Sequence, residues 1–315
     1  DLHSFPTRRS SDLNLCGGIK CLMNYQGVII SDSGGFQVYS LFTSKPGFGK
    51  ITDEGLLTYR DQKKQHRLLF TPEDSIKMQF ALKSDIMVCL DHFTPPQANS
   101  SEALESVKRT IAWAKRSQAE FKRQLAQRGL AKEPAAGRPQ LFAVIQGGSD
   151  YALRAYCAKE LLKLGFDGYG LGGLPFDEAG RLDIKLCRFN ASLTPDDLPK
   201  YAMGLGKIAD IIALYQCGYQ IFDCVLPTRD ARHGRLTLFN KTTLQSNYLH
   251  LRKKIYQQVQ QPLDPSCQCP TCQSCSLAYL HHLLKIGDSA YYRLATMHNL
   301  YQYQQLMLSL RSQIE

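Results

Sequence analysis

The sequence has no run of about eighteen apolar residues, the length that a membrane-spanning helix needs. It also begins without the charged and apolar segments of a secretory signal. We therefore expect no membrane segment and a cytoplasmic protein. Acidic residues are scarce relative to basic ones, with 28 Asp and Glu against 38 Lys and Arg and a formal net charge of +10. This excess of positive charge favours a polyanionic partner, with nucleic acid ahead of a membrane surface.

Two familiar patterns are also missing. No Gly-x-Gly-x-x-Gly follows the first predicted strand, which argues against an open, doubly wound dinucleotide-binding sheet. His92 is the single histidine at a predicted strand end, whereas a metal-dependent barrel hydrolase would need several there. The 11 cysteines are an odd number, and most are scattered through apolar segments. This pattern indicates a reducing compartment and not a disulfide framework.

Residues 1–13 are polar and lack periodicity. Such a segment could be a loop, a basic targeting tail or foreign sequence joined upstream. We favour foreign sequence and expect a non-native or disordered leader that takes no part in the fold.

Short apolar segments alternate with helix-like segments along the rest of the chain. The predicted strands are residues 27–31, 85–90, 141–145, 168–171, 201–205 and 219–222. The predicted helices are residues 101–128, 151–164, 177–190 and 208–216. Because strands alternate with helices, the sequence predicts a mostly parallel sheet in an α/β fold.

Polar residues or glycines follow nearly every predicted strand. They are Asp32, Asp91, Gln146, Gly172-Gly173, Gly206-Lys207 and Asp223. Functional groups at the carboxyl ends of parallel strands are typical of the active face of a (β/α)8 TIM-type barrel. An open sheet would concentrate them at one switch point, so we favour the barrel.

Two of these residues, Asp32 and Asp223, follow the first and the last predicted strands. Closure of a barrel would make those strands neighbours and bring the two carboxylates together. Such a pair can perform retaining glycosyl transfer, in which one carboxylate attacks and the other moves protons. Arg229 and Arg232 follow Asp223 and could hold phosphate. Each aspartate could alternatively be an ordinary cap of the turn after its strand.

The other strand ends offer groups that suit a purine base. Gly34 and Gly35 would let backbone N–H groups approach a ligand, and Phe36 could stack on a base. Asp91 could accept hydrogen bonds from the base edge, while the Gln146 amide could both donate and accept. Either polar residue could equally be a solvated turn residue.

A dense cysteine cluster, Cys267-x-Cys269-x-x-Cys272, lies in a loop rich in Pro, Ser and Gln. Three thiolates at this spacing suit tetrahedral zinc, with an iron-sulfur cluster as the alternative. From spacing alone the fourth ligand could be Cys275, His281, His282 or His298. A full protein ligand set leaves no open position, so the predicted Zn²⁺ is structural.

Four motifs in this order resemble those of the tRNA-guanine transglycosylases, also called queuine tRNA-ribosyltransferases. They are Ser31-Asp32-Ser33-Gly34-Gly35-Phe36-Gln37-Val38, Met203-Gly204-Leu205-Gly206-Lys207, Phe222-Asp223-Cys224-Val225-Leu226-Pro227-Thr228-Arg229, and the cysteine cluster followed by His298-Asn299-Leu300. The resemblance runs from about Gly17 to near the C-terminus. It implies a (β/α)8 barrel with an inserted zinc-binding lobe and a homodimer. It also implies exchange of guanine at the first anticodon position of tRNA for a 7-deazaguanine base such as preQ1.

The resemblance assigns roles residue by residue. Asp223 would be the nucleophile of a covalent ribosyl intermediate, and Asp32 the general acid and base. The base would be held by Ser33, Gly34, Gly35, Phe36, Asp91, Gln146, Gly173, Leu174 and Met203. The tRNA would contact Gly204, Leu205, Gly206, Lys207, Ile208, Ala209, Asp210, Thr228, Arg229, Asp230, Ala231 and Arg232. Zinc would bind Cys267, Cys269, Cys272 and His298.

The chain departs from the family pattern in two respects. In the family, the fold begins with a strand and a helix that precede the Gly17 region. Residues 1–13 stand in their place here, so we expect the barrel to lack its first strand. We accordingly expect the leader at 1–13, the barrel at 14–232, the zinc-binding lobe at 233–285 and a C-terminal helical closure at 286–315. In the pocket, Phe93 and Phe176 replace small residues of the bacterial pattern, which predicts an altered base preference.

Two other functions fit parts of the same evidence. One is base exchange in DNA, which a contact to the RNA 2′-hydroxyl would distinguish. The other is a non-catalytic tRNA-binding subunit of a heteromeric transglycosylase. The presence of both Asp32 and Asp223 argues against the second.

Overall fold

The computed structural model describes residues 17–45, 47–59, 67–177 and 179–312. The predicted leader, residues 1–13, lies outside them. The chain divides into two compact units between Tyr201 and Ala202. The predicted domain boundaries after residues 232 and 285 remain predictions.

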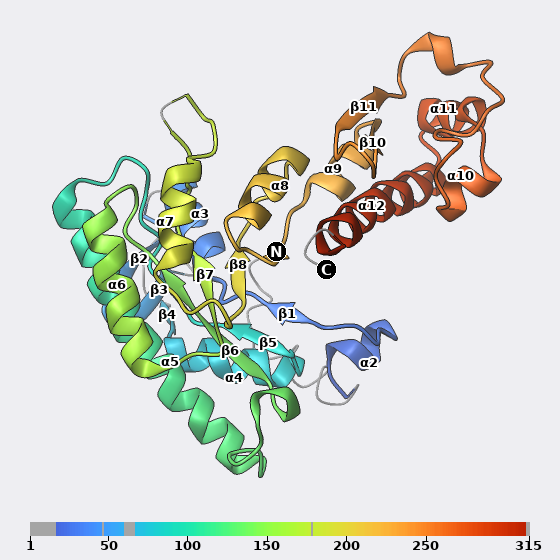
Figure 1. Ribbon diagram of the computed structural model, residues 1–315. Helices are drawn as coiled ribbons and strands as arrows, with labels where there is room; N and C mark the ends of the chain where they lie inside the picture. The colour runs from blue at the N-terminus through green and yellow to red at the C-terminus, as the bar shows by residue number, and fades with distance from the viewer. Residues whose placement is uncertain (1–16, 46, 60–66, 178, 313–315) are drawn as a thin grey trace. The chain divides into compact units, whose positions relative to one another are not determined.

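The first unit is built on a curled parallel sheet of half-barrel form (Figure 1). Its strands are β1 (Ile30–Ser31), β5 (Ile86–Val88), β6 (Gln140–Ile145), β7 (Gly168–Leu171) and β8 (Lys200–Ala202), in the spatial order β1-β5-β6-β7-β8. The parallel register pairs Ile30 with Ile86, Met87 with Leu141, and Val144 with Gly170. The predicted α/β class with a parallel sheet of the barrel type is therefore confirmed.

Helices precede or connect these strands. They are α2 (Ile19–Met23), which precedes β1, and α3 (Gly35–Ser44), α4 (Pro72–Leu82), α5 (Ser100–Gln127), α6 (Tyr151–Leu164) and α7 (Ile184–Ser192). Their ends follow from local chemistry. Thr71 and Asp74 form a capping box that begins α4, and Asn99 and Glu102 form one that begins α5. The apolar faces of α4, α5 and α6 pack on the sheet and form the main core of this unit.

The helix predicted over residues 177–190 was wrong in its first half. Helix α7 begins at Ile184, where the Asp183 side chain caps the Leu186 N–H at 3.0 Å. The preceding residues form a turn in which Gly180 has φ +72°, and Phe176 and Leu182 form an isolated antiparallel bridge. The left-handed turn at Gly180 therefore replaces the predicted helical start.

A second sheet in this unit was not predicted. It is antiparallel and contains β2 (Gly49–Thr52), β3 (Gly55–Tyr59) and β4 (Arg67–Phe70), in that order. Together with α3 and Trp113 it encloses a separate small core that includes Val38, Leu56 and Leu90.

The second unit is mainly helical. It contains α8 (Ile208–Gln216), β9 (Ile221–Phe222), α9 (Leu226–Arg232), α10 (Pro270–Ser274), α11 (Leu277–Ile286) and α12 (Ser289–Arg311), and an antiparallel hairpin of β10 (Arg235–Phe239) and β11 (Ser246–His250). Helix α12 packs on α9, β10, α10 and α11. Within the described residues, no helix combines the length and the apolar character needed to cross a membrane.

Candidate functional site

Asp32 lies directly after β1, where two donors hold its carboxylate. The Ser33 N–H donates to Oδ1 at 2.7 Å, and the Gln37 side chain donates to Oδ2 at 3.0 Å. Gly34, with φ +86°, turns the chain so that α3 starts at Gly35. Asp32 is exposed. It is thus an oriented carboxylate with access to solvent, as proton exchange requires.

Asp91 and Gln146 lie at the ends of the neighbouring strands β5 and β6, and they contact each other. The Gln146 Nε2 donates to Asp91 Oδ2 at 2.6 Å, and its Oε1 accepts from the Thr94 N–H at 3.2 Å. Gln146 is buried and Asp91 is half-buried. The structure therefore brings these two predicted base-binding residues together and fixes the direction of the amide.

The surroundings of Asp91 change its acidity. Burial of the carboxyl raises the pKa of Asp91 to about 7, the Gln146 hydrogen bond opposes this rise, and the charge of Asp32 adds to it. Asp91 therefore changes its charge near neutral pH. The negative charge of Asp32, after β1, thus contributes to the raised pKa of Asp91, after β5.

The ring of Phe36, the predicted stacking surface for the base, packs against Phe93. Phe36 is 49% exposed, and its ring packs in a T-shaped arrangement against Phe93 with centroids 5.2 Å apart. Tyr39 contacts the same Phe93 ring at 4.9 Å. Phe93 itself is buried. Phe93, one of the two phenylalanines that replace small residues of the bacterial pattern, thus supports the ring of Phe36. The other, Phe176, is half-buried beside Leu182.

The loop after β7 carries Gly172, Gly173 and Leu174. A Cβ at Gly172 would lie 2.7 Å from the Gln146 side-chain amide, so only glycine fits beside it. Gly173 has φ +79°, and Leu174 is 47% exposed. This loop therefore lies against Gln146, as the predicted base site requires. Sequence reasoning missed a residue beneath it, Arg154, although a lone arginine among the buried residues of α6 could have signalled it.

In the second unit, Asp223 follows β9 and contacts the turn after β8. The Gly204 N–H donates to Asp223 Oδ1 at 2.6 Å. The turn also packs on Cys224, because a Cβ at Gly206 would overlap the Cys224 side chain. The Tyr303 hydroxyl donates to the Gly206 carbonyl at 2.8 Å. Met203 is half-buried in this turn.

The residues predicted to contact tRNA differ in exposure. Gly204, Lys207, Ala209, Arg229 and Arg232 are exposed, Asp210 and Thr228 are half-buried, and Leu205, Gly206, Ile208, Asp230 and Ala231 are buried. Asp230 forms an ion pair with Arg235 at 3.1 Å. The buried side chains shape the two segments, and the exposed cations are the groups available to phosphate. The predicted pairing of Asp32 with Asp223 joins residues of different units and remains a prediction.

The structure brings Cys267, Cys269, Cys272 and His298 together in one buried group that could hold a metal ion. The three sulfurs lie 3.8, 3.5 and 3.4 Å from His298 Nδ1. Tetrahedral zinc, with Zn–S near 2.3 Å and Zn–N near 2.0 Å, would separate each sulfur from the nitrogen by about 3.5 Å. The donor set and its spacing therefore fit zinc.

Neighbouring groups orient these donors. The other ring nitrogen of His298, Nε2, hydrogen-bonds the Thr237 carbonyl at 2.7 Å, so Nδ1 faces the sulfurs. The Cys272 N–H donates to the Cys269 sulfur at 3.3 Å, and Gln302 Nε2 donates to the Cys267 sulfur at 3.2 Å. Donors of this kind stabilise thiolates.

The other candidates for the fourth ligand lie elsewhere. Cys275 ends α10, and its sulfur is 3.6 Å from the Ser274 hydroxyl. His281 hydrogen-bonds the Leu251 carbonyl through Nδ1 at 2.7 Å, and His282 is exposed. Of the four candidates left open by spacing, His298 is the one that joins the cysteines.

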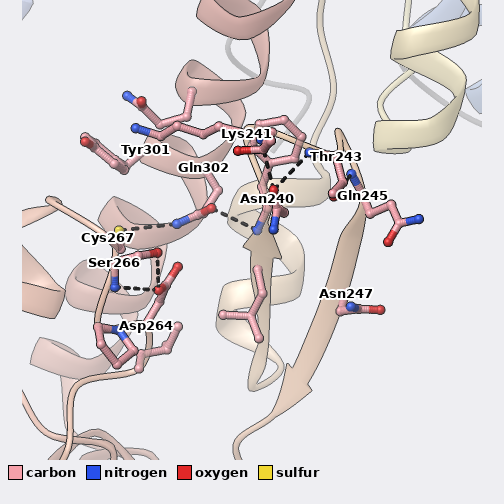
Figure 2. A pocket seen from close by; sticks show the side chains of 16 residues that line it. Asn240, Lys241, Thr243, Gln245, Asn247, Asp264, Ser266, Cys267, Tyr301 and Gln302 are labelled. Carbon is pink, nitrogen blue, oxygen red and sulfur yellow. Dashed lines mark hydrogen bonds between the residues drawn. The ribbon is translucent and has the colours of Figure 1, made fainter.

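A hollow of about 720 Å³ lies beside the metal group, and sequence reasoning did not find it (Figure 2). It is lined by the turn between β10 and β11, by residues 263–267 and by α12. Figure 2 shows Gln302 between the Cys267 sulfur and the end of β10, where its Oε1 accepts from the Phe239 N–H at 3.0 Å. Gln302 therefore links the hairpin to a metal-binding thiol.

Known proteins resemble the chain over nearly its full length. The family model for queuine tRNA-ribosyltransferase matches residues 2–315, and so includes the segment predicted to be a foreign leader. The queuine tRNA-ribosyltransferase of Methylacidiphilum infernorum is 39% identical over 94% of this chain and 75% of its own length. The protein of the same name from Aliivibrio salmonicida is 38% identical over 96% of this chain and 75% of its own. That of Pseudoalteromonas translucida is 40% identical over 95% and 73%.

Proposed function

Since the chain belongs to the queuine tRNA-ribosyltransferase family, we propose that it is a tRNA-guanine transglycosylase, a pentosyltransferase. It exchanges guanine at the first anticodon position of tRNA for a preQ1-like 7-deazaguanine base. The observation that carries this proposal is the oriented carboxylate of Asp223, which lies three residues before a helix bearing the exposed cations Arg229 and Arg232.

The reaction is a double displacement. Asp223 attacks C1′ of the ribose, so that a bond forms between C1′ and a carboxylate oxygen while the bond from C1′ to guanine breaks. Asp32 gives a proton to the departing guanine and takes one from the incoming base, which then attacks C1′ and releases Asp223. The hydrogen bond from Gly204 supports this role because it fixes the carboxylate without neutralising it.

The base is held by the strand ends of the first unit. Ionised Asp91 accepts from the N1–H and exocyclic amino groups of the base, and Gln146 presents its fixed amide to the same edge. Ser33, Gly34, Gly35, Gly173 and Leu174 line the site, with Phe36 and Met203 on the two faces of the base. The exposed Lys207, Arg229 and Arg232 hold phosphates of the tRNA.

Cys267, Cys269, Cys272 and His298 would hold Zn²⁺, which would stabilise the lobe that they close. With three thiolates and one imidazole the protein would supply all four ligands, so the ion would serve the fold and not base exchange. We further propose a cytoplasmic homodimer, for which sedimentation equilibrium over a range of protein concentrations is the test.

The test of the function is exchange of radiolabelled base into tRNA. An unmodified tRNA with guanine at the first anticodon position should take up label, whereas the same tRNA with adenine there should not. A DNA hairpin of the same sequence tests the alternative of DNA-directed exchange. Absence of label from the guanine-containing tRNA would contradict the proposal.

The choice of base is tested in the same assay with guanine, preQ1 and queuine. Because Phe93 supports Phe36, we expect Phe93→Cys to shift the relative KM values of the three bases. The wild-type series should differ from that of a bacterial enzyme with cysteine at this position. Identical series for the wild type and such an enzyme would refute the altered preference.

A further inference from the structure

A fully buried guanidinium lies beneath the two loops that carry the proposed base-binding residues. Arg154, in α6, has 0% of its surface exposed. It donates to the Gly148 carbonyl, in the loop after β6, at 2.7 Å and to the Ile145 carbonyl, at the end of β6, at 3.3 Å. It donates to the Gly172 carbonyl, in the loop after β7, at 3.0 Å.

These carbonyls flank the residues that would contact the base. Ile145 and Gly148 enclose Gln146, and Gly172 directly precedes Gly173. The last backbone hydrogen bond between the two strands runs from the Gly172 N–H to the Ile145 carbonyl at 3.0 Å. Beyond it the β-ladder no longer sets the spacing of the loops. Beyond this point Arg154 sets the spacing of the two loops, because it donates to the Gly148 carbonyl in one and to the Gly172 carbonyl in the other.

Close packing leaves the guanidinium little freedom. A Cβ at Gly147 would lie 2.8 Å from the Arg154 backbone nitrogen, so α6 begins directly against the loop. The Asn190 side chain, from α7, accepts from Arg154 at 2.9 Å. Helices α6 and α7 therefore both fix the position of the Arg154 guanidinium. A lysine at the same position could donate in too few fixed directions to hold all four acceptors.

Because of this geometry, we propose that Arg154 is a positioning residue for the base pocket. It sets the distance between Gln146 and the Gly173 loop, and so the affinity for the base, without touching the base itself. The inference rests on the proposed function, since it takes Gln146 and Gly173 as base-binding residues. An error of about 1 Å in such a pocket can cost on the order of 10²-fold in rate.

Arg138 provides a matched control at the opposite ends of the same two strands. It forms a two-pronged ion pair with Asp167 at 2.8 Å, and Asp167 also accepts from the Leu141 N–H at 2.9 Å. Arg138 therefore ties β6 to β7 as Arg154 does, but far along the strands from the loops. Loss of either arginine should lower the melting temperature, whereas only loss of Arg154 should weaken binding of the base.

The experiment measures KM for guanine and KM for tRNA separately in wild type, Arg154→Lys and Arg138→Lys, together with melting temperatures. We expect Arg154→Lys to raise the KM for guanine about tenfold or more with the KM for tRNA nearly unchanged. Arg138→Lys should leave both KM values at the wild-type level. Should Arg154→Lys keep the wild-type KM for guanine, or both variants raise it equally, the inference is overturned. A wild type that exchanges no base would instead refute the proposed function.

Discussion

Gly204 donates its backbone N–H to Oδ1 of Asp223 at 2.6 Å. The turn after β8 thereby orients the carboxylate after β9, and Gly204 can make this turn because it adopts φ +69°. The hydrogen bond from Gly204 is stronger when the Asp223 oxygen that accepts it carries a negative charge. This contact connects two of the four motifs that link the chain to its family.

Asp223→Asn should abolish both base exchange and the covalent RNA adduct. An amide is a poor nucleophile, and its size leaves the Gly204 turn intact. Denaturing gel electrophoresis after trapping with labelled tRNA would measure the adduct. Asp196→Asn is a suitable control, because the Asp196 side chain is exposed and belongs to none of the predicted base-binding or tRNA-binding sets. Adduct that persists in Asp223→Asn would remove its role as nucleophile.

Asp32→Asn should slow exchange by about 10² to 10⁴, the usual contribution of a general acid and base. The asparagine side-chain oxygen can still accept from the Ser33 N–H, and its amide group loses only the hydrogen bond from Gln37, so the fold around α3 should remain. Single-turnover exchange at saturating tRNA measures the chemical step. A rate within a few fold of the wild type would contradict the assignment.

Local signals explain the elements that were predicted well. Helix α6 spans residues 151–164 as predicted, because Asp150 caps its first turn and Gly165 ends it. The cysteine spacing likewise indicated the metal group. Contacts between residues far apart in the sequence are harder to predict. His298 lies 26 residues beyond Cys272, so spacing left it as one of four candidates and the resemblance to the family selected it. Arg154, which acts on a carbonyl 18 residues away, was missed.

The affinity for guanine should fall as the pH drops through about 7. Burial raises the pKa of Asp91 to about 7, so the carboxyl is ionised above this pH and protonated below it. Only the ionised form can accept both hydrogen bonds from the base. Isothermal titration with guanine between pH 5.5 and 8.5 measures the midpoint.

The same titration in Asp32 variants tests the cause of that midpoint. Asp32→Asn removes a negative charge that raises the pKa of Asp91, so the midpoint should move to lower pH. Asp32→Glu retains the charge and should leave it nearly unchanged. Equal midpoints in Asp32→Asn and wild type would show that the two carboxylates do not interact.

The purified protein should contain about one zinc per chain. Cys272→Ser should lose the ion and lower the melting temperature, because three donors bind zinc far more weakly than four. Cys275→Ser is the matched control, since Cys275 lies at the end of α10, the helix that carries Cys272, but outside the metal group. Elemental analysis and thermal unfolding measure both effects. Folded wild-type protein without zinc would overturn the assignment of the metal.

Asn299 connects α12, the helix that carries His298, to α9, the helix that carries Arg229 and Arg232. Its side chain donates to the Pro227 carbonyl at 3.0 Å and to the Arg235 carbonyl at 3.1 Å, and it accepts from the Thr237 N–H at 2.8 Å. Helix α12 also holds the other end of α9, where the Tyr291 hydroxyl donates to the Ala231 carbonyl at 2.9 Å.

Asn299→Ala should therefore weaken tRNA binding by loosening α9. It removes three hydrogen bonds to backbone groups, each of which contributes about 0.5–1.5 kcal/mol, so the melting temperature should also fall. We expect the KM for tRNA to rise about tenfold while the affinity for free guanine stays constant, because the base-binding residues of the first unit are not altered. Gln304→Ala, at an exposed position on the same helix, should change neither quantity. An unchanged KM for tRNA in a destabilised Asn299→Ala protein would show that α9 needs no support from α12.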